Sequence, residues 1–140
     1  MDGETITSCV IDAVQAKVNF DAAGTVTTDL TAPIQTKNEL GENYGMVAYG
    51  GAIAEWDAQA AAFASYITGK TASDVAAIAV TDTTAPAEAD LAASVTIKIG
   101  GFQDLIAKAA GAEASSEGAL HAFSLRSWAK TYSHLLCLLL

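Results

Sequence analysis

The segment Ser94-Val95-Thr96, with Lys98 two residues further on, has the residue types needed to bind an anionic ligand. Hydroxyl groups and the backbone N–H groups of a tight turn can donate hydrogen bonds to a phosphate, and a lysine adds positive charge. A helix predicted just after this turn would contribute further N–H donors at its N-terminus. We therefore expect an anion site at Thr96. The alternative interpretation is that Ser94 and Thr96 are helix caps.

No other group of reactive residues in the sequence has the spacing of a known site. His121 and His134 lack a His, Cys or carboxylate partner at metal-ligand spacing, so no metal site is expected. Cys9 and Cys137 form no metal motif, and their pairing stays open because a disulfide needs a specific Cα separation. The Gly69–Thr71 segment lacks the earlier glycine of a P-loop. Because no acid–base pair or nucleophile stands out, we do not expect an enzyme.

The overall charge excludes several classes of partner. The chain has 140 residues and a net charge of -9, from 16 acidic and 7 basic side chains. Nucleic-acid binding needs clustered Lys and Arg, so we expect no nucleic-acid partner, and an anionic membrane surface is disfavoured for the same reason. No apolar run approaches the roughly 20 residues of a membrane span, so we expect no membrane-spanning segment.

Charge also divides the chain into two parts. All 16 acidic residues lie at or before Glu117, whereas the last 22 residues contain Arg126 and Lys130 and no acid. This change predicts one domain over residues 1–110 and a different kind of segment over residues 111–140. That segment is either a linker or an atypical C-terminal tail, and a partner helix or read-through of an altered reading frame are both open explanations for it.

The N-terminal half of the domain is predicted to be mainly strand. Residues 5–12 are β-branched, and residues 14–20 alternate apolar and polar side chains, as a half-buried strand does. A tight turn at 21–24 then leads into a returning strand at 25–28. The glycine-rich residues 36–51 are expected to form a loop.

The second half is predicted to be helical. Apolar residues recur at helical spacing and end at Gly69, and they are Ile53, Trp56, Ala60, Phe63 and Ile67. Glu55, Asp57 and Gln59 lie off this stripe. Thr71 and Asp74 resemble a capping box that opens a short helix. One helical turn is expected at 86–90, and a last helix has its apolar face at Ile99, Phe102, Ile106 and Ala109.

This order of elements predicts an α+β domain, a small antiparallel sheet with two to three helices packed on it. The Asp2-Gly3 turn stands at the very start, and a turn normally joins two strands. We therefore expect a partner strand upstream of residue 1 and, with it, a longer protein that contains other domains.

Several of these segments resemble the FMN-binding domain family, flavin-carrying modules of cell-envelope electron-transfer proteins. Asp90 and Thr96 match the first and last positions of the family signature D-x-x-S-G-A-T, while Ala93, Ser94 and Val95 replace its S-G-A core. Thr36, Leu40 and Gly41 resemble the family segment E-T-P-G-L-G, although the proline is absent and the spacing is one residue longer. Trp56, Phe63 and Gly69-Lys70 resemble the family's aromatic helix. The pieces follow the family's order over about residues 1–110.

The resemblance implies an extracytoplasmic location, as in secreted proteins and lipoproteins of Gram-positive bacteria, and flavin carriage for electron transfer. The residues that it places at the FMN site are Thr96, Ser94, Asp90, Lys98, Thr36 and Gly41. Tyr44, Met46 and Tyr49 could stack on the flavin ring. Because Val95 restricts the close approach that the family's smaller residues permit, we expect non-covalent binding of FMN or another small anionic ligand, or a degenerate site. The alternative is a non-catalytic cell-surface structural or interaction domain without a cofactor.

Overall fold

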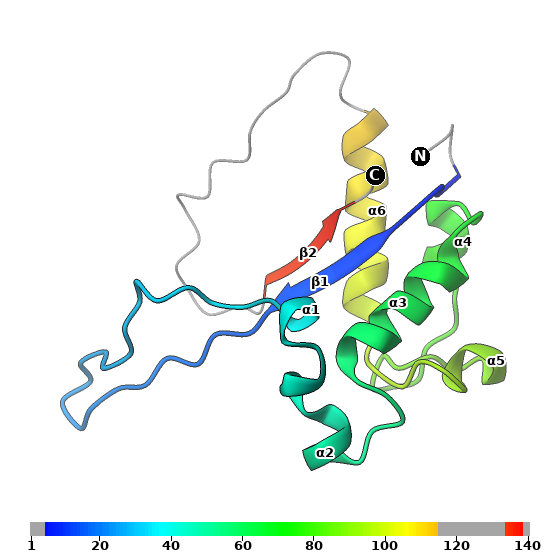
Figure 1. Cartoon of the computed structure of the whole chain (residues 1–140). Helices are drawn as coiled ribbons and strands as arrows, with labels where there is room; N and C mark the ends of the chain where they lie inside the picture. Colours follow the sequence, from blue (N-terminus) through cyan, green and yellow to red (C-terminus); the bar gives the residue numbers. More distant parts are fainter. Residues whose placement is uncertain (1–4, 115–133, 139–140) are drawn as a thin grey trace.

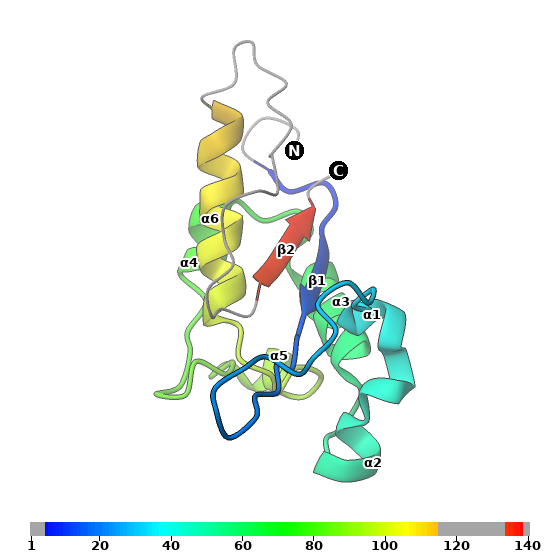
Figure 2. The same cartoon turned by 90° about the vertical axis from the view of Figure 1, so that its left-hand side faces the viewer.

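The computed structural model describes residues 5–114 and 134–138 of the chain. It is mostly helical, with 43% helix against 11% strand. Two long helices dominate, α3 (Trp56–Ile67) and α6 (Gly100–Ala114). Strand β1 (Val10–Val14) pairs with β2 (His134–Leu138) in an antiparallel ladder that crosses in front of α6 in Figure 1. The two views place β1 next to α3 and β2 next to α6 (Figures 1 and 2).

The predicted fold class, an α+β domain with helices packed on a small antiparallel sheet, is wrong. Helix content far exceeds strand content, and in the described residues the only ladder is the β1–β2 pair. The strand predicted at 5–12 is confirmed in part: β1 begins at Val10, and Thr5 forms an isolated bridge with Thr71. Val14 is the last residue of β1, but residues 15–20 and 25–28 leave the body of the protein and form no ladder with the other described residues, so no continuous sheet forms there.

Residues 15–35 form a projecting arm, which extends to the left in Figure 1. The tight turn predicted at 21–24 is confirmed, with Asp21 Oδ1 accepting from the N–H groups of Ala23 and Thr25 and with Gly24 at φ +82°. The two strands predicted beside this turn are wrong, because the two segments form an isolated bridge between Phe20 and Val26 and a hydrogen bond from the Asn19 N–H to the Thr28 hydroxyl, but no ladder. The arm consists of two neighbouring chain segments with no hydrophobic layer packed against them. An isolated hairpin of this kind is only marginally stable in water.

The remaining described helices are short. They are α1 (Lys37–Leu40), the 3₁₀ helix η1 (Gly41–Tyr44), α2 (Met46–Gly50), α4 (Ala72–Ala76) and α5 (Ala89–Ala92). The loop expected at 36–51 is therefore wrong. Its polar residues act as caps: Thr36 and Glu39 form a capping box at α1, and the Glu55 carboxylate accepts from the N–H groups of Met46 and Val47 at 2.8 and 3.0 Å. These hydrogen bonds satisfy the first N–H groups of α1 and α2, which have no partner within their own helix. The glycine-rich sequence did not indicate these helices.

Helix α3 confirms the helical stripe and supplies the centre of the core. Phe63 is fully buried, and its ring lies 5.7 Å from the ring of Phe102 on α6. Phe102 in turn meets Trp56 edge to face at 6.0 Å. Ile53, which the stripe included, lies before the helix and is 57% exposed. Of the apolar residues predicted for the last helix, Phe102 and Ile106 are buried on α6 and Ile99 is buried just before it, whereas Ala109 is half-buried.

The capping box at Thr71 and Asp74 is confirmed at the start of α4. Thr71 Oγ1 accepts from the Asp74 N–H, and the Asp74 carboxylate accepts from the Thr71 N–H. The backbone hydrogen bond from Thr71, with its hydroxyl, lowers the pKa of Asp74. Because the folded-state pKa is below the unfolded value, this contribution to stability is present above the ordinary carboxyl pKa and is lost as the pH falls through the lowered one.

We expect Thr71→Ala to lower the free energy of unfolding by about 1 kcal/mol, the usual effect of losing an N-cap hydroxyl. Urea unfolding followed by circular dichroism measures the change. Ser73→Ala is the matched control, since Ser73 is an exposed residue of the same helix. Equal losses in the two variants would show that the box does not stabilise α4.

Candidate functional site

The loop that contains Thr96 connects α5 to α6. Its side chains alternate: Ser94, Thr96 and Lys98 are exposed, while Val95 and Ile97 are buried in the core. Helix α6 begins only at Gly100, so Thr96 follows the end of α5 and does not lie in the first turn of α6. The helix N-terminus that was expected to support an anion at Thr96 is therefore several residues away.

A buried glutamine on α3 holds this loop in place. Gln59 is fully buried, and its Oε1 atom accepts hydrogen bonds from the Thr96 N–H at 2.8 Å, the Thr96 hydroxyl at 3.1 Å and the Ile97 N–H at 3.2 Å. Its Nε2 group donates to the Ala54 carbonyl at 2.8 Å. One side chain thus satisfies three donors from the loop and one acceptor from the chain before α3, as buried polar groups require.

This arrangement bears directly on the expected flavin site. A phosphate at Thr96 would need the N–H groups of Thr96 and Ile97 and the Thr96 hydroxyl, and all three already donate to Gln59. A ligand oxygen would have to displace a buried amide whose other end is also hydrogen-bonded, which leaves buried polar groups without partners. As placed here, the loop does not fit a flavin phosphate held by Thr96.

The other candidate site residues are not gathered at Thr96. Asp90 lies exposed on α5, whereas Thr36 and Gly41 cap the two ends of α1. Helices α1 and α5 lie apart in both views (Figures 1 and 2). Ser94 and Lys98 lie near Thr96 because they are its neighbours in the sequence. Thr36 and Gly41, at the ends of α1, lie elsewhere.

The aromatic residues expected to stack on a flavin ring have other neighbours. The Lys37 ammonium lies over the rings of Tyr44 and Trp56, 4.6 and 4.9 Å from their centroids. The Tyr44 hydroxyl donates to Gln15 in the arm. Tyr49 is 93% exposed, and its ring lies against Gly45, where a Cβ would come within 2.6 Å of it. Tyr44 therefore forms part of a cation–π cluster that fastens α1 to α3.

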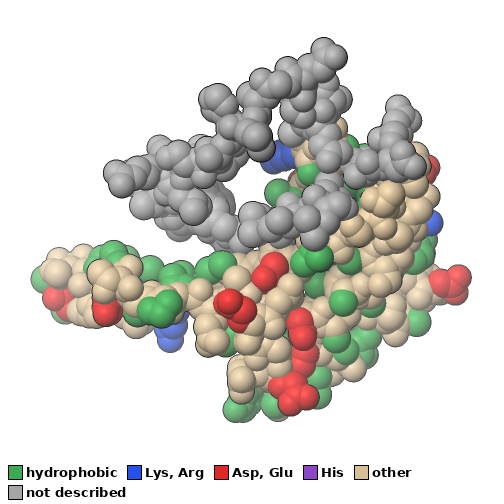
Figure 3. Space-filling model, turned by 45° about the horizontal axis from the view of Figure 1, so that its top comes forward, with side chains coloured by type: hydrophobic (Ala, Val, Ile, Leu, Met, Phe, Trp, Pro, Cys, Tyr) green, Lys and Arg blue, Asp and Glu red, His purple; other side chains and the backbone are tan. Residues whose placement is uncertain are grey.

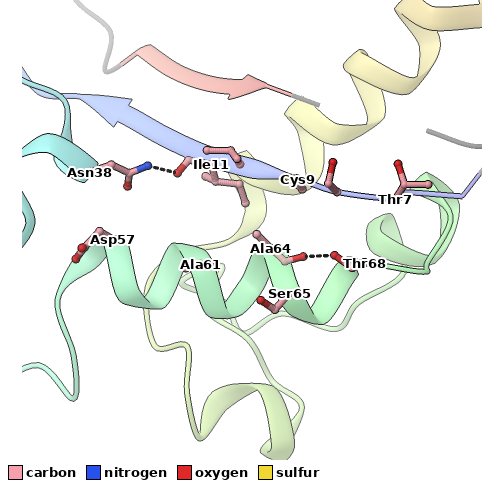
Figure 4. Close-up of a pocket in the computed structure, with 11 residues that line it drawn as sticks. Thr7, Cys9, Ile11, Asn38, Asp57, Ala61, Ala64, Ser65 and Thr68 are labelled. Atoms are coloured by element: carbon pink, nitrogen blue, oxygen red, sulfur yellow. Dashed lines mark hydrogen bonds between the residues drawn. The ribbon is translucent and has the colours of Figure 1, made fainter. Parts of the chain in front are cut away.

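A groove lies between the extended segment around β1 and helix α3; we call it the β1–α3 groove (Figure 4). Its volume is about 460 Å³, within the usual range of small-molecule sites. Small and hydroxyl-bearing side chains dominate its lining, which consists of Thr7, Ser8, Cys9, Val10, Ile11, Asn38, Asp57, Ala61, Ala64, Ser65 and Thr68. Sequence reasoning missed this site because its residues come from three separate segments.

A second cavity, of about 510 Å³, lies beside the C-terminal end of α3. There the Tyr66 hydroxyl donates to Glu88 at 2.7 Å, and this hydrogen bond raises the pKa of Tyr66. The Lys70 ammonium lies 4.6 Å from the centroid of the Tyr66 ring. Tyr66 thus contacts both Lys70 and Glu88, and its hydrogen bond to Glu88 joins α3 to the start of α5, which is a structural role.

The surface is acidic, as the composition requires: acidic side chains far outnumber Lys and Arg in the space-filling view (Figure 3). Within the described ranges, no group of three His, Cys, Asp or Glu side chains could hold a metal ion. Among the helices of the same ranges, none has the length and apolar character needed to cross a membrane. The side chains of both histidines and of Cys137 lie outside the described part of the chain. Most of the predicted segment 111–140 also lies outside it.

Comparisons with known proteins add no assignment: no family model, no curated protein and no solved structure matches the chain. The resemblance to FMN-binding domains therefore stays a prediction.

Proposed function

We propose that this chain is a non-catalytic, extracytoplasmic binding module, related to FMN-binding domains, in which the Thr96 loop has a structural role. One observation carries the proposal. Gln59 accepts hydrogen bonds from the three donors of the loop that a flavin phosphate would need. A degenerate flavin site of this kind agrees with the replacement of the family's S-G-A core by Ala93, Ser94 and Val95.

Two further features support a binding module. The described residues contain a groove of small-molecule size outside the Thr96 loop, so loss of the flavin site does not leave the domain without a place for a ligand. The acidic, lysine-poor composition and the many threonines suit a secreted bacterial protein. Flavin carriage in electron transfer is the competing proposal, and it requires the loop to release Gln59.

Titration with FMN tests the proposal. We expect no saturable quenching of flavin fluorescence, and no difference between FMN and riboflavin, which lacks the phosphate. Thr96→Ala should leave both titrations unchanged, because the hydroxyl donates inward to Gln59. Tight, saturable binding of FMN that Thr96→Ala abolishes would overturn the proposal in favour of flavin carriage. Mass spectrometry of protein secreted by a Gram-positive host checks for covalent FMN, and we expect the mass of the polypeptide alone.

A further inference from the structure

Hydrogen bonds lie at both ends of the β1–α3 groove. At the Thr7 end, Ile6 is tied to the residues after α3 by hydrogen bonds from its N–H to the Lys70 carbonyl, at 2.9 Å, and from the Gly69 N–H to its carbonyl, at 2.8 Å. At the opposite end, the Asn38 side chain on α1 donates to the Ile11 carbonyl at 3.0 Å. These contacts mark the two ends of the groove, and its volume of about 460 Å³ suits a small molecule.

The length of the groove follows from the helix that forms its floor. Asp57 and Thr68 line it near opposite ends of α3 (Figure 4). A rise of 1.5 Å per residue separates their backbones by about 16 Å along the helix axis. Between them, Ala61 and Ala64 present only methyl groups, which leaves space for an aliphatic chain over the helix.

The polar groups at both ends offer acceptors. The Thr68 hydroxyl donates its proton to the Ala64 carbonyl at 3.0 Å, so towards the groove its oxygen can only accept. Asn38 donates one Nδ2 hydrogen to Ile11, which leaves its Oδ1 atom as an acceptor and its second Nδ2 hydrogen as a donor. Asp57 is the one charged side chain in the lining, and an ionised carboxylate only accepts. A positively charged ligand that donates hydrogen bonds at both ends complements these acceptors.

From this complementarity we propose that the β1–α3 groove binds a linear aliphatic polyamine, with one ammonium group at Asp57 and Asn38 and another amine group at Thr68. The net charge of -9 favours the approach of a polycation. Lys37 is not part of the groove lining, and its ammonium group lies over the rings of Tyr44 and Trp56. It therefore does not occupy the place of the bound cation. A phosphate-bearing ligand such as FMN meets a carboxylate and no cation among the lining residues. The inference rests on the proposed function, since it names the ligand class of the binding module.

Titration of the full chain with spermidine, followed by ¹⁵N–¹H NMR, tests the site. We expect saturable shifts that are confined to the amides of residues 7–11, 38 and 57–68. Asp57→Asn should weaken binding by about tenfold or more, since a hydrogen bond to a charged group is worth at least that factor. Asp104→Asn is the matched control: it removes the same charge from an exposed position on α6, outside the groove, and should leave the affinity unchanged.

Two further variants test the shape of the groove. Ala61→Leu adds a side chain over the floor and should block spermidine, while thermal melts check that the variant is folded. Thr68→Val keeps the side-chain volume but removes the hydroxyl acceptor. It should weaken the binding of spermidine more than the binding of butylamine, which has a single amine.

Equal weakening by Asp57→Asn and Asp104→Asn, or shifts spread over all acidic surfaces, would overturn the proposal and indicate general attraction to the negative chain. Absence of saturation at millimolar spermidine would also overturn it. Either result leaves the proposed function intact as long as FMN does not bind at Thr96. Conversely, FMN binding abolished by Thr96→Ala would overturn the proposed function whatever spermidine does.

Discussion

Replacing Phe63 with alanine should lower the free energy of unfolding by about 3–5 kcal/mol, the usual cost of removing a fully buried phenyl ring. Phe63 is 0% exposed and lies at the junction of α3 and α6, where its ring contacts Phe102. Removing it takes away buried apolar area and leaves a cavity between two helices, next to Phe102, which also packs edge to face against Trp56. Urea unfolding monitored by tryptophan fluorescence and by circular dichroism measures the loss.

The arm offers a matched control for this substitution. Phe20 is 62% exposed and lies outside the core, so Phe20→Ala removes the same side chain without a buried cavity. We expect it to change the free energy of unfolding by less than about 0.5 kcal/mol. If both variants unfold at the wild-type urea concentration, the α3–α6 contact is not the centre of the core.

Replacing Gln59 with methionine should lower the free energy of unfolding by about 2–4 kcal/mol, as expected when several buried polar groups lose their partner. Methionine keeps the length and most of the volume of glutamine, so packing changes little. It cannot accept from the N–H groups of Thr96 and Ile97 as the amide oxygen does, and it cannot donate to the Ala54 carbonyl. The effect therefore isolates the hydrogen bonds that hold the Thr96 loop.

Hydrogen exchange gives this prediction a local measurement. The amides of Thr96 and Ile97 should be protected in the wild type and should exchange faster in Gln59→Met. Gln35→Met is the control, since Gln35 is exposed and lies away from α3, at the end of the arm. Unchanged exchange at Thr96 and Ile97 in Gln59→Met would contradict the structural role of the loop and would restore these donors as candidates for a ligand.

The two substitutions separate the roles of α3. Phe63 joins α3 to α6 through apolar contacts, whereas Gln59 joins it to the loop before α6 through hydrogen bonds. The opposite side of the same helix, with Ala61 and Ser65, lines the β1–α3 groove. One helix thus supports the core, holds the Thr96 loop and forms the floor of the proposed polyamine site.

Local patterns in the sequence were enough to predict the elements that depend on contacts between residues close together in the chain. The spacing of Trp56, Ala60 and Phe63 predicted α3, and the Thr71 and Asp74 pair predicted the start of α4. Helix periodicity and capping boxes depend on residues three or four apart, so a single sequence contains the necessary information. The turn at 21–24 was predictable for the same reason, because Asp21 and Gly24 act within one turn.

The strand predictions failed where pairing decides the outcome. Residues 14–20 and 25–28 have the alternation of strands, but a strand exists only if another segment pairs with it, and β1 instead pairs with residues 134–138. In the same way, residues 36–51 are helical because Glu55 and the Thr36 capping box satisfy their N–H groups. Neither a distant partner strand nor a carboxylate from a later segment is visible in a local pattern.

The candidate site shows the same division. The sequence marked Thr96 by its type and by its resemblance to a flavin motif, but Gln59 lay off the predicted apolar stripe and was not connected with it. Its spacing of three from Trp56 and four from Phe63 was the available signal, since these intervals place it on the inner side of the helix. Sequence by itself determined which residues could donate to an anion. Only the tertiary structure decided that Gln59, 37 residues before Thr96 in the chain, already accepts from them, because a hydrogen bond between distant segments depends on how α3 packs against the loop.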